Sequence, residues 1–496
     1  MAEYRKDWIQ RWATYHPDKV AVREADTGRS LSYGELDDRG DRAAAFLTAR
    51  LGLKKGSRVA ILADFCLEYA VLLSAAQKTG IILVPLNYRL ATRELAFMLD
   101  NCQPEVFIAD TQYMPKLEGH ECLGRIRHIQ KPATFMEAVE ATAPADLPPV
   151  ALAEEDPLLI LYTSGTTGFP KGAMYTHGMA FWNSINTASR LDITSDDHTL
   201  VCMPPFHTGG WNVLFTPFLH HGASVTLVKK FEAGEVLAAL DEEKATLFMA
   251  VPTMLRMMSD DPAFDKVALS SIRYFIVGGE PLPIPTIERW HAKGVLIRQG
   301  YGLTEVGPNV TSLHQDDAIR KKGSIGKPNF YVDYRLVDDD GKDCGKGDAG
   351  EFWLRGPMVT PGYWQNDEAT GSALQNGWFK TGDVVKEDED GYLYVVDRKK
   401  NMYISGGENV YPAEVEHFLR THPAIDEVAV IGVPDARWGE SGKAFVAIKE
   451  GAMISGQEIK DYCTGKLAKY KIPRDVAFVG ELPKNASGKV ARTELS

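Results

Sequence analysis

The sequence predicts an α/β protein: a large N-terminal domain of helix-covered sheets with a β-rich subdomain, followed by a small C-terminal α+β domain. Three observations support this prediction. The chain has 496 residues, too many for a single hydrophobic core, so about two to four domains are expected. Short apolar runs alternate with helix-like periods from about residue 20 to about residue 400. After about residue 318 the pattern becomes richer in strands and turns.

The alternation of strands and helices is clearest in the first 300 residues. The short β-prone runs are Val59–Ala63, Ile81–Pro85, Val106–Ala109, Leu158–Tyr162, Ser224–Val228, Leu247–Ala250 and Tyr274–Val277. Helical patterns lie between them at Cys66–Thr79, Gly234–Glu243 and Pro285–Lys293. Because strands separated by helices usually form parallel sheets, we expect sheets that are covered by helices.

The last third of the chain has a different pattern. Strand candidates at Tyr334–Val337, Gly350–Arg355 and Tyr392–Val396 are separated by turn-rich segments, which favours a more antiparallel β unit. The tail then offers two helices and two strands, enough for a small α/β domain: Ala413–Arg420, Val428–Val433, Phe445–Lys449 and Gln457–Leu467.

Composition and charge exclude several classes of protein. With 44% hydrophobic and 25% charged residues, the chain is typical of a soluble globular protein. The net charge of −12 argues against sequence-independent nucleic-acid binding, which needs a basic surface. None of the six cysteines forms a CxxC or a zinc-like cluster, which is typical of a reduced intracellular protein. The N-terminus lacks a signal-peptide pattern and no apolar stretch is a membrane-span candidate, so we expect a cytoplasmic protein.

The segment Thr163–Lys171 has the composition of a phosphate-binding loop. Small residues let backbone N–H groups approach an anion, hydroxyls add donors, and Lys171 adds a positive charge. The loop is not a Walker A motif, because Pro170 precedes Lys171 and Gly172 follows it, so the hydroxyl that would hold magnesium is missing. A plain Gly/Ser/Thr turn is the alternative interpretation.

Five motifs resemble those of the acyl-adenylate-forming superfamily, which includes acyl-CoA synthetases, peptide-synthetase adenylation domains and beetle luciferases. They occur in the family's order and are TSGTTGFPKG at 163–172, YGLTE at 301–305, TGD at 381–383, DRKK at 397–400 and PKNASGK at 483–489. The resemblance implies an ATP- and acyl-binding domain at 1–398, with its β-rich subdomain at about 319–398. It also implies a hinge at 399–400 and a mobile C-terminal domain at 401–496.

The reaction implied by this resemblance joins a carboxylic acid to coenzyme A in two steps. ATP first adenylates the acid and pyrophosphate leaves; coenzyme A then takes the acyl group and AMP leaves. Both reactants of the first step are anionic, so their charge must be neutralised and their geometry fixed. By resemblance, Thr163 and Glu305 contact Mg²⁺, a hard cation that prefers oxygen ligands. Thr304 contacts the α-phosphate, and Lys489 bridges that phosphate and the substrate carboxylate.

The resemblance also implies a nucleotide site. Tyr301 would pack on the adenine, residues 278–280 would form the opposite wall, and Asp383 with Arg398 would bind the ribose. The family often has a small residue at the position of Glu280. The implied nucleotide-binding residues are Thr163, Ser164, Gly165, Thr166, Thr167, Gly168, Lys171, Gly278, Gly279, Glu280, Gln299, Gly300, Tyr301, Thr304, Asp383 and Arg398.

Thiol attack requires Lys489 and its loop to move away. In the family the C-terminal domain rotates about a hinge, and Lys400 matches the hinge position. The rotated face would present 405–408, where Gly407 leaves room for the pantetheine arm. Candidates for binding coenzyme A are Gly407, Trp438, Tyr470, Lys471 and Arg474, with an ordinary aromatic and basic surface as the alternative.

The acyl pocket is expected around residues 204–211. His207 would lie beside the carboxylate, Trp211 would gate the acyl tunnel, and Gly209 with Gly210 would leave space for a long or bulky acid. A core histidine and a core tryptophan are the alternative. The spacing of His207 and Trp211 resembles the fatty acyl-CoA synthetase branch, so the sequence predicts a medium- or long-chain fatty acid–CoA ligase.

Other functions stay open at this point. An aryl acid such as benzoate or coumarate would fit the same motifs, as would an adenylate-forming enzyme with another acceptor. A non-catalytic nucleotide sensor is disfavoured by the presence of both Lys489 and Glu305. The sequence does not set the oligomeric state, and a homodimer is compatible with it.

Overall fold

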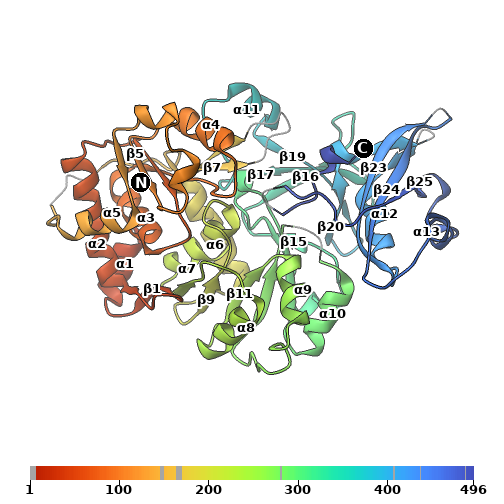
Figure 1. Cartoon of the computed structure of the whole chain (residues 1–496), viewed down its shortest axis with the longest axis horizontal. Helices are drawn as coiled ribbons and strands as arrows, with labels where there is room; N and C mark the ends of the chain where they lie inside the picture. The colour runs from red at the N-terminus through yellow and green to blue at the C-terminus, as the bar shows by residue number, and fades with distance from the viewer. Residues whose placement is uncertain are drawn as a thin grey trace. The chain divides into compact units, whose positions relative to one another are not determined.

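The computed structural model describes residues 7–145, 150–163, 170–279, 282–405, 408–435, 437–485 and 488–495. The chain forms two compact units (Figure 1). Unit 1 comprises Met1–Asp333 and Leu354–Phe379, and unit 2 comprises Tyr334–Trp353 and Lys380–Ser496. Both units combine helices with sheets, so the predicted α/β class is confirmed.

Unit 1 contains a nine-stranded sheet. Its inner neighbours are parallel, and antiparallel strands flank them at both edges. In spatial order the strands are β15 (Lys327–Pro328), β14 (Thr311–Ser312), β13 (Ile297–Tyr301), β12 (Tyr274–Val277), β11 (Leu247–Ala250), β9 (His198–Val201), β10 (Ser224–Leu227), β1 (Val20–Glu24) and β2 (Ser30–Ser32).

A six-stranded sheet forms the other half of unit 1. All its pairs are parallel except the last, the antiparallel hairpin of β7 and β8. In spatial order the strands are β6 (His128–Gln130), β5 (Val106–Ala109), β3 (Arg58–Leu62), β4 (Ile82–Pro85), β7 (Pro157–Thr163) and β8 (Lys171–Thr176).

Helices cover both faces of these sheets. They are α1 (Trp8–Tyr15), α2 (Tyr33–Ala45), α3 (Leu67–Thr79), α4 (Thr92–Cys102), α5 (Pro132–Glu140), α6 (His177–Leu191), α7 (Phe215–His220), α8 (Ala233–Glu242), α9 (Pro252–Asp260), α10 (Ile284–Ala292) and α11 (Asp367–Ala373). Figure 1 shows α8, α9 and α10 together along one side of the nine-stranded sheet.

The cores of unit 1 follow the alternation of side chains along its strands. In β12, Tyr274 and Ile276 point into a core that both sheets share, whereas Phe275 and Val277 point into a second core beneath α8, α9 and α10. Successive side chains of a strand face opposite sides, so a strand that is apolar throughout must be buried on both faces. This explains why the apolar runs of the sequence are unbroken instead of alternating.

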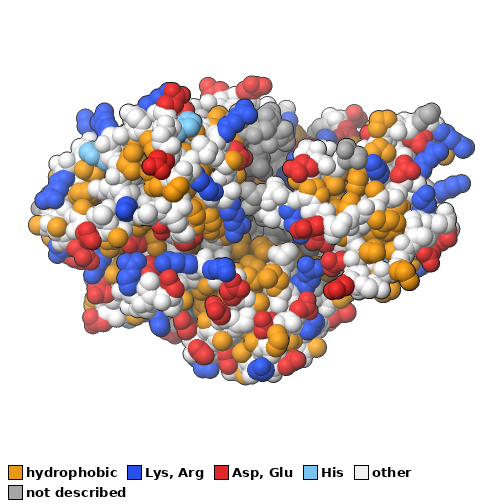
Figure 2. Space-filling view, viewed as in Figure 1, with side chains coloured by type: hydrophobic (Ala, Val, Ile, Leu, Met, Phe, Trp, Pro, Cys, Tyr) orange, Lys and Arg blue, Asp and Glu red, His pale blue; other side chains and the backbone are white. Residues whose placement is uncertain are grey.

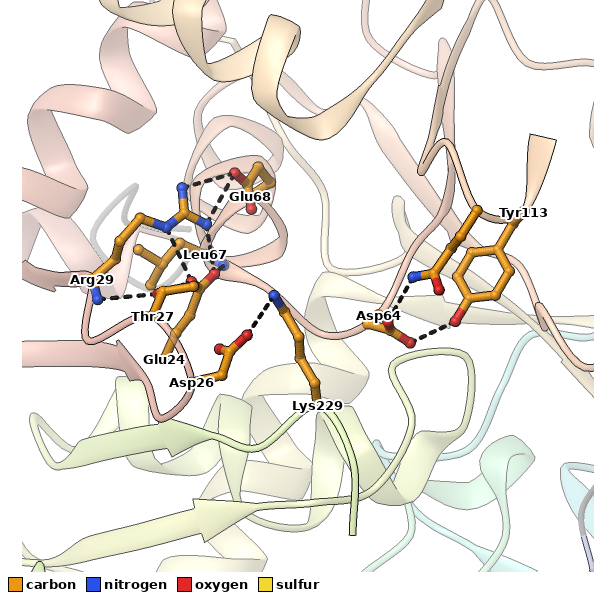
Figure 3. Close-up of polar contacts among 10 residues, drawn as sticks. Glu24, Asp26, Thr27, Arg29, Asp64, Leu67, Glu68, Tyr113 and Lys229 are labelled. Atoms are coloured by element: carbon orange, nitrogen blue, oxygen red, sulfur yellow. Dashed lines mark hydrogen bonds and ion pairs between the residues drawn. The ribbon is translucent and has the colours of Figure 1, made fainter.

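Buried carboxylates tie the end of β1 to the start of α3 (Figure 3). The fully buried Glu24 accepts a hydrogen bond from the backbone N–H of Leu67 at 3.0 Å. Arg29 pairs with Glu24 at 2.7 Å and with Glu68 at 3.3 Å. Burial alone would raise the pKa of Glu24, but hydrogen bonds from Arg29, Thr27 and Leu67 outweigh it, so this pKa lies below its ordinary value.

Unit 2 is built mainly on antiparallel pairs, and the pair of β24 with β25 is parallel. One sheet runs through β16 (Asp333–Val337), β17 (Ala349–Arg355) and β19 (Trp378–Glu387), with β20 (Leu393–Arg398) also paired to β19 and β18 (Leu374–Gln375) paired to its first residues. A second sheet has the order β22 (Glu408–Val410), β21 (Tyr403–Ser405), β24 (Gly439–Ile448) and β23 (Ile425–Asp435), with β25 (Asp475–Phe478) beside β24. Its helices are α12 (Pro412–Leu419) and α13 (Gly456–Cys463).

Among the elements that the sequence predicts, the bounds differ most from the observed ones in unit 2. The strands β5, β11 and β12 have the predicted bounds, whereas β23 and β24 are 11 and 10 residues long and extend well beyond the predicted Val428–Val433 and Phe445–Lys449. Helix α13 ends at Cys463, four residues before the predicted Leu467. The long hairpin forms because cross-strand pairing carries both strands through glycine-rich ends that have little β propensity of their own.

The surface and the helices also bear on the predicted class. Acidic and basic side chains are interspersed over the face drawn in Figure 2. Within the described ranges, none of the helices has the length and apolar character that crossing a membrane would need.

Candidate active site

The two ends of the predicted phosphate loop lie opposite each other on a hairpin. Thr163 is the last residue of β7 and Lys171 is the first of β8, and the two are cross-strand partners. The hydroxyl of Thr163 lies 3.4 Å from the carbonyl oxygen of Lys171. The predicted phosphate-binding residues between them, Ser164, Gly165, Thr166, Thr167 and Gly168, lie outside the described residues.

Glu305 reaches this hairpin from a distant part of the chain. It lies in the 3₁₀ turn Thr304–Val306, and both Thr304 and Glu305 are buried. The hydroxyl of Thr163 donates to Oε1 of Glu305 at 3.3 Å, although the two residues are 142 positions apart. The structure therefore brings together the two residues predicted to contact magnesium.

The side-chain oxygens of Thr163 and Glu305 are suitable magnesium ligands, but they do not make a complete ligand set. A carboxylate and a hydroxyl are oxygen donors, which is the ligand type that Mg²⁺ prefers. In the part of the chain that the structure describes, no group of three or more His, Cys, Asp or Glu residues is arranged to hold a metal ion. A magnesium ion bound here would therefore need phosphate and water oxygens as further ligands.

Tyr363 is a site residue that the sequence reasoning missed. Its hydroxyl donates to the same Oε1 of Glu305 at 3.0 Å. The Nζ atom of Lys171 lies 5.5 Å from the centre of the Tyr363 ring. No motif in the sequence pointed to this residue; the only local signal was an aromatic pair after a proline and a glycine, in Pro361-Gly362-Tyr363-Trp364.

The segment carrying Tyr363 is attached to β8 and to Glu305 through the backbone. The N–H of Trp364 donates to the carbonyl of Gly172 at 2.7 Å, and the N–H of Met174 donates to the carbonyl of Gly362 at 3.1 Å. The N–H of Thr360 donates to the carbonyl of Glu305 at 2.7 Å. Residues 360–364 thus act as an added partner of β8 that also fixes the Thr304–Val306 turn.

The predicted adenine edge lies where β12 and β13 end. Gly278 and Gly279 follow β12, and Val277 of β12 pairs with Gln299 of β13. A Cβ atom at Gly278 would lie 3.4 Å from the carbonyl oxygen of Gly300, and Gly279 has a φ of +91°, which favours glycine. A flat, side-chain-free surface therefore lies beside β13. Glu280 lies outside the described residues.

Two other predicted residues of this edge differ in how the structure uses them. The side-chain amide of Gln299 accepts from the N–H of Leu282 and donates to the carbonyl of Ser324, both at 3.1 Å. This amide therefore supports the loops around the edge. Tyr301 ends β13 and is half-buried.

Asp383 and Arg398, the predicted ribose pair, are neighbours in unit 2. They are cross-strand partners on β19 and β20, and Nε of Arg398 lies 2.7 Å from a carboxylate oxygen of Asp383. Asp383 is buried while Arg398 is half-exposed. The pairing orients the Asp383 carboxylate.

The acyl segment fixes the tautomer of its histidine. The N–H of Gly209 donates to Nδ1 of His207 at 3.0 Å, so a neutral His207 ring carries its proton on Nε2. Trp211 is fully buried, and its indole N–H donates to the carbonyl of Pro205. Three aromatic rings surround the indole at 5.5–5.8 Å: Phe65, Tyr69 and Phe215.

The expectation that Gly210 leaves space for a long acid is wrong. A Cβ atom at Gly210 would lie 2.4 Å from the carbonyl oxygen of Pro204, and one at Gly209 would lie 3.1 Å from Nδ1 of His207. These positions lack side chains because the chain folds tightly back on itself at the turn Gly209–Val213. Gly210 therefore accommodates the backbone of Met203 and Pro204, whereas Gly209 faces the side chains of His207 and Met203.

Lys489 lies on a tight turn in unit 2. Its N–H donates to the side chain of Asn485 at 3.0 Å, and its carbonyl accepts from the N–H of Asn485 at 2.8 Å. The Lys489 side chain is exposed. The predicted hinge residue Lys400 is also exposed and lies in the 3₁₀ turn Lys399–Asn401.

Asp397 links the residues on either side of Lys400. Its carboxylate accepts from the N–H of Arg398 at 2.6 Å, from the side chain of Asn401 at 3.2 Å and from the N–H of Ala413 at 2.6 Å. The last bond reaches the first turn of α12. This single carboxylate therefore attaches the segment before the predicted hinge to the domain after it.

The structure describes four of the five predicted coenzyme A residues, all of them in unit 2. Asp435 accepts from the N–H of Trp438 at 3.0 Å and pairs with Arg474, so these two candidates are close together. Lys471 pairs with Glu414 at 2.7 Å. Tyr470 is half-buried in the turn Lys469–Lys471, and Gly407 lies outside the described residues.

Comparison with known proteins decides the family. Residues 9–364 match the AMP-binding enzyme family, and residues 414–489 match the AMP-binding enzyme C-terminal domain. The chain belongs to the AMP-binding enzyme family. This confirms the superfamily that the five motifs indicated, and the chain is an ATP-dependent acid–CoA ligase of the AMP-forming type.

Relatives match this ligase over nearly their whole length. A feruloyl-CoA synthase of Amycolatopsis is 41% identical, with 98% of this chain and 97% of the relative covered. An indoleacetate–CoA ligase of Aromatoleum aromaticum is 38% identical, with 99% and 97% covered. The long-chain-fatty-acid–CoA ligase FadD13 of Mycobacterium tuberculosis is 37% identical, with 98% and 97% covered.

Solved structures agree with the fold of this ligase. The o-succinylbenzoate-CoA synthetase MenE of Bacillus subtilis, in complex with ATP and a magnesium ion, matches with a TM-score of 0.88 at 32% identity. The match covers 99% of each chain. The ATP-bound MatB of Rhodopseudomonas palustris matches with a TM-score of 0.91 at 33% identity, covering 99% of this chain and 98% of that one.

Proposed function

We propose that this ligase activates an aromatic or arylalkanoic carboxylic acid, in the class of cinnamic and indoleacetic acids. The observation that carries the proposal is the fixed position of Trp211. This side chain is fully buried, hydrogen-bonded to Pro205 and surrounded by Phe65, Tyr69 and Phe215. Packed in this way, Trp211 would be a fixed boundary of the acyl pocket and would not move aside to admit a long chain. A fixed boundary favours a compact, planar acyl group.

The relatives support the same class of acid. Two of them are named for acids with an aromatic ring, ferulate and indoleacetate, at 41% and 38% identity. An aromatic ring of the substrate would gain offset or edge-on contacts with an aromatic side chain that lines the acyl pocket, worth about 0.5–1.5 kcal/mol for each pair. Alkyl chains would gain only the apolar area.

A medium- or long-chain fatty acid is the second candidate. FadD13, named for long-chain fatty acids, is 37% identical over 98% of this chain. The spacing of His207 and Trp211 also favours it, as the sequence predicts. Accommodating such a chain beside Trp211 would require the Trp211 cluster to open, because Trp211 is fully buried.

In the first step, a carboxylate oxygen of the acid attacks the α-phosphorus of ATP, and the bond to pyrophosphate breaks. Thr163 and Glu305 would hold Mg²⁺ together with phosphate oxygens, and the ion supplies charge neutralisation. Lys489 would bridge the two reacting anions and stabilise the charge of the transition state. His207 accepts from the N–H of Gly209 at Nδ1, and its Nε2–H would orient the substrate carboxylate.

In the second step, the thiol sulfur of coenzyme A attacks the acyl carbonyl of the adenylate. The bond to AMP breaks, the thiol proton leaves to solvent, and the thioester forms. Lys489 must withdraw for the thiol to approach, and rotation about Lys400 would achieve this. Asp383 and Arg398 would keep the ribose of AMP in place through both steps.

An acid panel tests the proposal. Pyrophosphate release and acyl-CoA formation are measured with cinnamate, ferulate, indoleacetate, benzoate, decanoate and palmitate, with and without coenzyme A. We expect kcat/KM for at least one aromatic acid to exceed that for decanoate and palmitate by at least about 10-fold, in line with the 1–3 kcal/mol that separates substrates in an apolar pocket. A preference for palmitate would overturn the aromatic assignment and favour the fatty acid.

A further inference from the structure

We propose that Tyr363 is a positioning residue for the adenylation step, holding Glu305 through its hydroxyl and Lys171 through its ring. This inference rests on the proposed roles of Glu305 towards magnesium and of Lys171 towards phosphate. It adds a residue that belongs to none of the five motifs. One rigid side chain would thus set the distance between the carboxylate of the metal side and the ammonium of the phosphate side.

The hydroxyl contact orients the carboxylate. Oε1 of Glu305 receives hydrogen bonds from Tyr363 at 3.0 Å and from Thr163 at 3.3 Å. Glu305 is buried, and hydrogen bonds to a buried carboxylate are strong and directional. A phenol carries its proton at neutral pH, so Tyr363 is the donor of this bond and the carboxylate oxygen is the acceptor.

The ring contact acts on Lys171. An ammonium within about 6 Å of an aromatic ring centre is attracted to the face of the ring, and Nζ of Lys171 lies 5.5 Å from the centre of Tyr363. Lys171 begins β8, and the segment that carries Tyr363 is hydrogen-bonded along the same strand. The ring and the lysine are therefore held by the same strand, and the ring attracts the ammonium without adding a negative charge of its own that would compete with phosphate.

The consequence should be specific to the first half-reaction. Loss of the phenol leaves Glu305 oriented by one hydroxyl fewer, which weakens its hold on the metal that accompanies ATP. Pyrophosphate has already left when the thiol attacks, so the metal-side carboxylate has little part in the second half-reaction. A merely structural role would affect both half-reactions alike.

The test substitutes Tyr363→Phe in the full-length protein, which removes the hydroxyl and keeps the ring. Calorimetric titration of ATP at several Mg²⁺ concentrations measures the Mg²⁺ dependence of ATP binding without any acid. We expect the Mg²⁺ concentration for half-maximal ATP affinity to rise by about 10-fold, the scale of one hydrogen bond to a charged group. Pyrophosphate release with a good acid should fall similarly, while thioester formation from synthetic acyl-adenylate should change by less than about 2-fold.

Tyr113→Phe is the matched control. The hydroxyl of Tyr113 donates to a carboxylate oxygen of Asp64 at 2.7 Å, the same type of bond on other elements of unit 1 (Figure 3). This variant should keep the wild-type Mg²⁺ dependence. Tyr363→Leu, which also removes the ring, should raise the KM for ATP beyond the value for Tyr363→Phe, because Lys171 then loses its ring contact.

The outcomes separate this inference from the proposed function. Wild-type Mg²⁺ dependence in Tyr363→Phe, or equal loss of both half-reactions, would overturn the positioning role. If Tyr363→Phe lowers stability, the double variant with Glu305→Gln decides: a functional bond requires the two effects on Mg²⁺ dependence to be non-additive, and additivity contradicts it. Failure of the wild-type protein to release pyrophosphate with any acid contradicts the proposed function alone, since the metal–ATP titration uses no acid.

Discussion

At the scale of single residues, the candidate site depends on side chains that meet only in three dimensions. Thr163 and Glu305 are 142 positions apart, and Glu305 and Tyr363 are 58 apart, yet one carboxylate oxygen receives both hydroxyls. The motif resemblance predicts the first pair because both members lie in recognisable segments. Tyr363 escaped prediction because its partner is set by the folding of residues 360–364 onto β8, which leaves no local pattern.

The error at Gly210 has a related cause. A glycine in a sequence marks a missing side chain, and the absence is equally compatible with an open cavity and with a close backbone contact. Here the carbonyl of Pro204 occupies the position, 2.4 Å from where a Cβ would lie. Whether a glycine marks a cavity or a close backbone contact depends on how the neighbouring turn folds. The number of small residues in the segment does not distinguish the two.

Lys489 carries the clearest prediction about a single residue. Lys489→Ala should abolish adenylation, because the variant lacks the positive charge that would bridge the two anionic reactants. Thioester formation from pre-made acyl-adenylate should stay within about 3-fold of wild type, since that step requires the lysine to withdraw. Both half-reactions are measured separately, by pyrophosphate release and by acyl-CoA formation.

Lys484→Ala is the control for Lys489→Ala. Lys484 lies on the same turn but pairs with Glu427 at 2.7 Å, so its loss should spare both half-reactions. Equal loss of the two half-reactions in a folded Lys489→Ala protein would contradict the two-pose mechanism.

At the scale of elements, apolar runs predict buried strands with their bounds, whereas strands whose length depends on cross-strand pairing are not predicted correctly. The buried runs of β5, β11 and β12 have the predicted bounds because every residue in them is apolar. The hairpin of β23 and β24 continues through Gly432 and Gly442, whose positions are set by packing. A Cβ at either glycine would lie 2.4 Å from an atom of the Tyr403 side chain. Tertiary packing on Tyr403 thus outweighs the low β propensity of glycine.

The turn around Lys400 carries the prediction that belongs to the element scale. Lys400→Pro fixes φ at the predicted hinge and removes a backbone N–H. We expect acyl-CoA formation from acyl-adenylate to fall by at least about 10-fold, with adenylation less affected, if the resting pose is the adenylating one. Lys400→Ala keeps the freedom of the backbone and should retain both activities. Loss of adenylation alone in Lys400→Pro would mean that the resting pose is the other one.

At the scale of the whole molecule, unit 1 depends on contacts between its two halves. One core is shared by the nine-stranded and six-stranded sheets. Glu24 ties β1 of the nine-stranded sheet to Leu67, the first residue of α3. The alternation of strands and helices along the sequence predicts sheets that are covered by helices. It could not predict that a fully buried carboxylate would join them, because the sequence gives no sign that Arg29 and the N-terminus of α3 converge on Glu24.

This buried carboxylate makes the stability of the molecule depend on pH. The pKa of Glu24 is lower in the folded than in the unfolded state. The ionised Glu24 therefore contributes fully to the free energy of unfolding above the unfolded pKa of about 4.3, and this contribution is lost as pH falls through the folded pKa. Glu24→Gln removes the charge and should lower the free energy of unfolding at pH 7 by about 1–3 kcal/mol, the scale of a buried charged hydrogen bond. Scanning calorimetry at pH 7, 5, 4 and 3.5 should show a constant difference in Tm between wild type and variant down to about pH 5, and a smaller difference below it.

Asp26→Asn is the control, because Asp26 pairs with Lys229 at 2.8 Å at a half-exposed position, where an ion pair contributes about 0–1 kcal/mol (Figure 3). A difference in Tm for Glu24→Gln that stays constant to pH 3.5 would mean that Arg29 and the helix N-terminus do not stabilise this carboxylate in its charged form.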